Sequence, residues 1–145
     1  MRLIGGNPGV GLFLLRVVVG VVFVVHGLGK LLGPPLGAGL AALQALLTQL
    51  GMPEPAVLVW VIVAVELLGG VCLILGAGVT IAGLLLAGEM LVALATFRAP
   101  YGVAAYHFGD LAARGYEYAL VLAAASLAIA LGGPGILALQ VKQKE

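Results

Sequence analysis

Charged residues are scarce in this chain. Only 9% of its 145 residues are Asp, Glu, Lys or Arg, whereas 63% are hydrophobic. A water-soluble globule needs more polar surface than this composition contains. We therefore expect an integral membrane protein. The net charge is only +1, and no basic patch with interleaved aromatic residues is present, so nucleic-acid binding is not expected.

Cysteine is also almost absent, because Cys72 is the only one. A single cysteine forms neither an internal disulfide nor a CxxC redox pair, so we interpret Cys72 as a packing residue. The few His, Cys, Asp and Glu residues do not have the spacing typical of metal ligands. The residues therefore predict no metal site, and no cofactor is evident from them.

Long hydrophobic runs dominate the chain instead. A helix needs about 20 apolar residues to cross a hydrocarbon layer of about 30 Å. Four runs meet or approach this length, at about residues 10–32, 56–75, 79–97 and 116–131. A shorter amphipathic segment, at about residues 37–50, predicts an interfacial or re-entrant helix. The expected fold class is thus all-α, an integral membrane four-helix bundle that forms a single transmembrane domain over residues 1–145.

The orientation follows from the basic residues near the span ends. Four spans place both termini on one side, and Lys and Arg are equally numerous on the two sides, so the positive-inside rule gives a tie. The three basic residues on the side opposite to the termini lie next to acidic or aromatic residues, which favours termini in the cytoplasm. We expect a multi-pass protein of the cytoplasmic (inner) membrane. The residues compared are Arg2, Lys142 and Lys144 against Lys30, Arg98 and Arg114.

Three charged residues lie deep inside the expected spans. Arg16 lies within the first span, and Glu66 and Glu89 lie near the centres of the second and third. Each costs roughly 2.5 to 3.5 kcal/mol at the bilayer centre, so these residues need partners, protons or a polar cavity. With a rise of about 1.5 Å per residue, their depths predict that Arg16 pairs with Glu66 or Glu89.

A second polar group lies towards the other end of the first span. His26 and Lys30 are expected near Glu117, which opens the antiparallel fourth span, so we expect Glu117 to pair with Lys30 or His26. At about 100° per residue, Arg16 and Lys30 share one helix face and His26 lies on its flank. The candidate intramembrane polar or ligand site therefore consists of Arg16, His26, Lys30, Glu66, Glu89 and Glu117.

Short motifs extend over nearly the whole chain. They read Arg16-x3-Gly20-x2-Phe23-x2-His26-Gly27-x2-Lys30-Leu31, Gly51-Met52-Pro53, Glu66-Leu67-x-Gly69-Gly70-x2-Leu73-x2-Gly76, Gly115-Tyr116-Glu117-x-Ala119-Leu120 and Gly133-Pro134-Gly135. Together they resemble the DoxX family of small bacterial and archaeal membrane proteins. Members of that family usually continue the last motif with a small polar residue and an aspartate, whereas this chain continues with Ile136-Leu137-Ala138-Leu139-Gln140.

The resemblance implies a four-helix membrane protein. Founding members of the family are linked to quinol oxidase and thiosulfate:quinone oxidoreductase systems, and others to membrane-associated oxidant-resistance complexes. An association with oxidoreductases is therefore implied by the family alone, because the residues show no active site of their own.

The first hypothesis for function is a redox-associated subunit that binds a quinone or a similar lipid-soluble molecule. Such a molecule needs an apolar slot, hydrogen-bond donors and protons. The polar groups available for this are Arg16, His26, Glu66 and Glu89. Two alternatives remain open, a non-catalytic scaffold or partner subunit with a buried salt-bridge network, and a transporter of a small solute or protons. Expected partners are the lipid bilayer, other membrane or redox subunits, and a second copy that docks on glycine faces such as Gly83 and Gly88.

Overall fold

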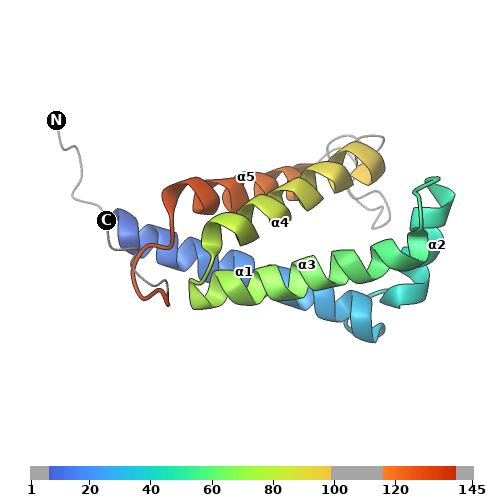
Figure 1. Ribbon diagram of the computed structural model, residues 1–145, viewed down its shortest axis with the longest axis horizontal. Helices are drawn as coiled ribbons and strands as arrows, with labels where there is room; N and C mark the ends of the chain where they lie inside the picture. Colours follow the sequence, from blue (N-terminus) through green and yellow to red (C-terminus); the bar gives the residue numbers. More distant parts are fainter. Residues whose placement is uncertain (1–6, 99–115, 140–145) are drawn as a thin grey trace, which may run out of the picture.

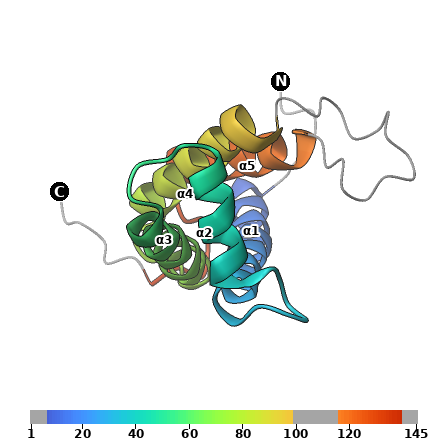
Figure 2. The same cartoon turned by 90° about the vertical axis from the view of Figure 1, so that its right-hand side faces the viewer.

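The chain forms an antiparallel helical bundle. The computed structural model describes residues 7–98 and 116–139, and these ranges contain helices and no strands. The elements are α1 (Pro8–Leu32), α2 (Gly39–Gln49), α3 (Pro55–Leu75), α4 (Val79–Ala93), the π-helical turn η1 (Leu94–Arg98) and α5 (Glu117–Gly132). The helices α1, α3, α4 and α5 run side by side (Figure 1). The short α2 lies across the end of the bundle where α1 ends and α3 begins (Figure 2).

Capping residues explain where the helices begin and end. The Asn7 side chain accepts hydrogen bonds from the backbone N–H groups of Gly9 and Val10, at 3.1 and 3.4 Å, and so starts α1. Gly76 ends α3 and Gly78 precedes α4, with φ angles of 71° and 59°. Glycine adopts this left-handed conformation without strain. The turn between these two glycines therefore folds α3 and α4 into a tight hairpin.

The predicted fold class, an all-α membrane four-helix bundle, is confirmed. The helices over residues 8–32, 55–75 and 79–96 are long and apolar enough to cross a membrane. The fourth helix, α5, is also apolar but has only 16 residues. The short helix expected between the first two spans is α2, whose one buried side chain is Leu47.

Parts of the sequence-based predictions concern residues outside the described ranges. These residues are 1–6, 99–115 and 140–145, and they include Arg2, Arg114, Lys142 and Lys144, on which the predicted orientation depends. The extent of a single domain over residues 1–145 therefore stays a prediction.

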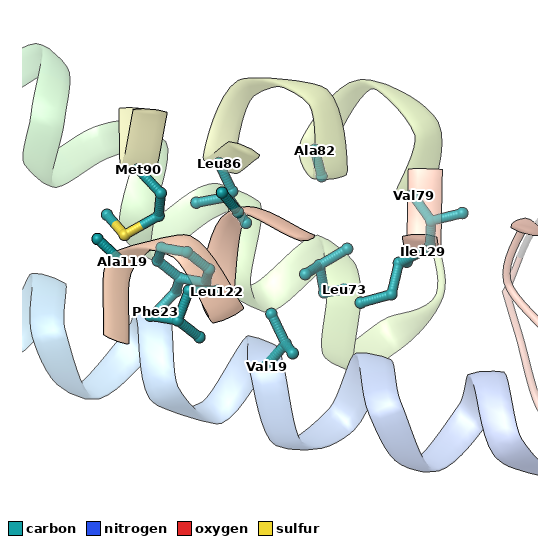
Figure 3. Packing of buried hydrophobic residues seen from close by; sticks show 11 residues of the cluster. Val19, Phe23, Leu73, Val79, Ala82, Leu86, Met90, Ala119, Leu122 and Ile129 are labelled. Atoms are coloured by element: carbon teal, nitrogen blue, oxygen red, sulfur yellow. The ribbon is translucent and has the colours of Figure 1, made fainter. Parts of the chain in front are cut away.

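The apolar core lies between α1, α3, α4 and α5. All four helices contribute fully buried side chains, among them Phe23, Leu73, Leu86 and Ile129. Figure 3 shows Met90 of α4 close to Ala119 of α5, whereas Val79 lies near Ile129 towards the opposite end of the cluster. Because Met90 directly follows Glu89, α5 begins at the level of Glu89.

Glycines bring α1 and α3 into close contact. A Cβ atom on Gly20 would lie 2.6 Å from the carbonyl oxygen of Gly70, so the two backbones touch here. A Cβ atom on Gly27 would lie only 3.3 Å from the Cβ atom of Glu66. Small residues permit such close helix packing. This packing places Glu66 directly against α1, beside the turn that leads to Lys30.

Candidate functional site

Three charged side chains from three helices meet inside the bundle. The Lys30 Nζ atom lies 2.6 Å from Glu66 Oε1 and 3.5 Å from Glu89 Oε1. The Glu66 side chain is 1% exposed, that of Glu89 14% and that of Lys30 28%. We call Lys30, Glu66 and Glu89 the carboxylate cluster. It is closed at Glu66 and accessible at Lys30 and Glu89.

Helix geometry brings these three residues together. Side chains on a helix tilt towards its N-terminus, so the long Lys30 side chain reaches back towards the level of Gly27. Glu66 lies at that level, because α1 and α3 are antiparallel and Gly27 makes room for it. Glu89 joins from α4, which pairs with α3 in the hairpin.

The cluster has more negative than positive groups. One ammonium faces two carboxylates, so the three ionised side chains would have a net charge of −1. An uncompensated charge inside a membrane is costly. Charge balance is reached when the two carboxylates together hold one proton.

An aromatic pair lies one helical turn before Lys30 on α1. His26 Nε2 and the Tyr118 hydroxyl oxygen are 3.5 Å apart, and the two rings are T-shaped with centroids 5.7 Å apart. This contact joins α1 to the start of α5. Glu117 precedes Tyr118, and its Oε2 atom is buried. The expected pairing of Glu117 with Lys30 or His26 stays a prediction.

Arg16 lies in a different place. The prediction that it pairs with Glu66 or Glu89 is wrong, because all five of its N–H groups donate to backbone carbonyls. Along α1 it is about 21 Å away from Lys30. Arg16 is fully buried and also lies over the ring of Phe13, with its Cζ atom 5.1 Å from the ring centroid.

The Arg16 acceptors explain its role. Two of them close the C-terminal end of α3, and three belong to the segment after α5. They are the carbonyls of Leu73 (2.8 Å) and Ile74, and those of Pro134 (2.8 Å), Ile136 (3.0 Å) and Leu137. The last carbonyls of a helix have no partner within the helix and carry partial negative charge. Arg16 satisfies them and fastens the segment after α5 to α1 and α3. We call this arrangement the arginine clamp.

The sequence contains a signal for each of these outcomes. Gly76 and the motif Gly133-Pro134-Gly135 end two helices, and helix ends leave carbonyls that a buried arginine can satisfy. Lys30 follows Gly27 by one turn, and a glycine in a span predicts close approach of another helix. Sequence reasoning assigned Lys30 to Glu117 and so missed its contact with Glu66 and Glu89. Within residues 7–98 and 116–139, no group of three His, Cys, Asp or Glu side chains could hold a metal ion.

The chain is similar to a known protein family and to a curated relative. The DoxX family profile matches residues 11–99. The chain is also 33% identical over 132 residues to a protein of Bacillus subtilis (strain 168) described as "Putative oxidoreductase CatD". This alignment covers 90% of the present chain and 84% of the Bacillus protein. No solved structure matches the chain significantly.

Proposed function

Since the chain belongs to the DoxX family of multi-pass membrane proteins, we propose that it is a small redox-associated subunit that binds a quinone or a similar lipid-soluble carrier at the carboxylate cluster. The observation behind this proposal is one ammonium between two carboxylates, placed inside the bundle and open on one side. The description of the Bacillus relative as an oxidoreductase supports the redox association.

The residues of the cluster fit a quinone head group. A lysine ammonium has three N–H donors, and that of Lys30 forms ion pairs with Glu66 and Glu89. The Lys30 side chain is 28% exposed, so its ammonium can also donate to a carbonyl oxygen of the carrier. The surrounding helices are apolar, as a lipid-soluble carrier requires.

Protons are the second requirement. A quinone takes up protons at its oxygens when it is reduced. Glu66 lies closer to Lys30 Nζ, at 2.6 Å against 3.5 Å, so its negative charge is better compensated, and Glu89, at the open side of the cluster, holds the proton where the carrier would bind. Glu66 is buried and also pairs with Lys30. It can therefore take up a proton and keep the cluster neutral when Glu89 gives up its own. Arg16 takes no part, because its donors are all engaged in the arginine clamp.

Quinone titration of the purified protein in lipid nanodiscs tests the proposal. A quinone without a tail reports on the head-group site alone. Lys30→Met and Glu89→Gln should each weaken binding at least about tenfold, the cost of losing a hydrogen bond to a charged group. Glu54→Gln is the matched control, because Glu54 is an exposed carboxylate before α3. The proposal is overturned if the unmodified protein binds no quinone, or if all three variants bind it equally well.

The proposed location is the cytoplasmic membrane, with both termini in the cytoplasm. Lys30 is paired inside the bundle, so it no longer counts among the loop charges of the opposite side. This leaves Arg2, Lys142 and Lys144 on the terminal side against Arg98 and Arg114, a difference that supports cytoplasmic termini. Labelling of Lys144→Cys in a Cys72→Ala background with a membrane-impermeant maleimide tests this. Reaction in intact cells would refute it.

A second candidate function is a non-catalytic partner subunit. It is favoured by the polar contacts that join helices, since the arginine clamp and the two ion pairs connect α1 with α3, α4 and the segment after α5. The same titration separates the two functions. A scaffold binds no quinone, and its Glu89→Gln variant differs from the unmodified protein in stability alone.

A further inference from the structure

An apolar groove runs between α3 and α4, the hairpin that carries both carboxylates of the cluster. Its volume is about 370 Å³, within the range of ligand pockets. Small residues make room for it on both helices, namely Ala64 and Gly69 on α3 and Gly78 and Ala82 at the start of α4. Apart from the Cys72 thiol, the side chains that line the groove are apolar, so it suits a hydrocarbon chain.

The groove opens towards the surrounding lipid. Leu68, Ile81 and Leu85 form part of its lining and are 67%, 69% and 53% exposed. A hydrocarbon chain can therefore enter from the bilayer without any movement of the helices.

The α4 side of the groove leads to the carboxylate cluster. Gly78, Ala82 and Leu85 line the groove, and their spacing of four and three residues keeps them on one face of the helix. Four residues further along the same face is Glu89, whose carboxylate lies 3.5 Å from Lys30 Nζ. This spacing places Glu89 one turn beyond Leu85 on the α4 face that lines the groove.

The depth of the polar end indicates the kind of molecule. The helix over residues 79–98 is about 30 Å long, and Glu89 lies near its middle, about 15 Å from either end. A phospholipid head group would have to bring a charged phosphate to this depth, which is very unfavourable. An uncharged head with carbonyl or hydroxyl oxygens meets no such cost. The site therefore fits a lipid-soluble molecule with a small uncharged polar head and a hydrocarbon tail.

We propose that the groove between α3 and α4 holds the hydrocarbon tail of the same carrier whose head binds at Glu89 and Lys30. This inference rests on the proposed function and adds the tail to it. From the head at Glu89, the tail lies along Leu85 and Ala82 towards Gly78, over a length of about 16 Å.

Photolabelling in nanodiscs tests the tail site directly. The probe is a quinone with a diazirine on a decyl tail, and a phosphatidylcholine with a diazirine on an acyl chain is the comparison. The quinone probe should insert mainly into residues 64–72 and 78–85. A tenfold excess of decyl quinone without diazirine should reduce this insertion about tenfold by mass action. The phospholipid probe should insert along the outward faces of all helices and should not respond to the quinone.

Two variants at adjacent positions sharpen the test. Cys72 lines the groove, whereas Val71 is 44% exposed and lies outside it. Cys72→Phe fills the groove and should abolish the quinone-specific insertion. Val71→Phe adds the same bulk on the lipid side and should retain it. If Cys72→Phe does not fold, Ala64→Phe fills the other part of the α3 wall.

The outcomes separate this inference from the proposed function. Insertion spread evenly over the bundle, or unaffected by excess quinone, overturns the tail site even when the tail-less quinone binds in a Glu89-dependent manner. Failure of the tail-less quinone to bind overturns both. Oxidative cross-linking of two copies through Cys72 would assign the groove to a second copy and also overturns the tail site.

Discussion

Arg16→Met removes every donor of the arginine clamp and keeps a long side chain in its place. Five hydrogen bonds are lost. At about 1 kcal/mol net for a typical intramolecular hydrogen bond, the five together correspond to a loss of about 5 kcal/mol. The three acceptors after α5 lie in a partly exposed segment and can bond to water instead. The two acceptors at the end of α3 cannot do so as easily, which sets a lower value of about 2 kcal/mol.

Arg16→Lys should give an intermediate result. An ammonium has three N–H donors, and its single nitrogen cannot reach carbonyls that surround a planar guanidinium on several sides. It retains the positive charge at the C-terminal end of α3, where the helix dipole favours a cation. We therefore expect Arg16→Lys to lose about half as much free energy of unfolding as Arg16→Met.

Unfolding in mixed micelles, with SDS as the denaturant and circular dichroism as the signal, measures both variants. A loss below about 0.5 kcal/mol for Arg16→Met would refute the reasoning, because surface substitutions alone have effects of that size. Quinone affinity of the folded fraction is the second measurement. It should stay unchanged in Arg16→Lys, and a tenfold loss there would place Arg16 in the ligand site after all.

Three further substitutions test other parts of the structure. Lys30→Met should cost about 3 to 5 kcal/mol, because the buried Glu66 and the partly buried Glu89 both lose their cation. Adding Glu66→Gln should recover part of this loss in a double-mutant cycle, and purely additive effects would argue against the ion pair. Gly20→Ala should cost about 1 to 3 kcal/mol because its Cβ atom meets the α3 backbone, whereas Gly11→Ala has open space and should stabilise α1 by up to about 1 kcal/mol. Equal thermal shifts in these two variants would contradict the close packing of α1 on α3. Ser126→Ala should be neutral or stabilising by up to about 1 kcal/mol, since its buried hydroxyl has no hydrogen-bond partner in the described part of the chain; a clear loss of stability would reveal one.

Much of the fold can be predicted from the amino-acid order. Apolar runs of about 20 residues predict spans, and glycine and proline mark their ends, so the sequence-based ranges agree closely with α1, α3 and α4. The same order of residues identifies Glu66 and Glu89 as buried charges that need a partner. These features are local, because a helix forms and ends according to residues within a few turns of one another.

The partners of the buried charges depend on how the helices are placed against each other. Position along a helix gives depth only when all helices start at the same level, and α1 is shifted along its axis relative to α3, so that Lys30 and not Arg16 meets Glu66. Gly20 and Gly27 set this shift, because they are the points where α1 can approach the α3 backbone. Axial offset between helices arises from such close contacts of distant segments, which no single stretch of sequence specifies.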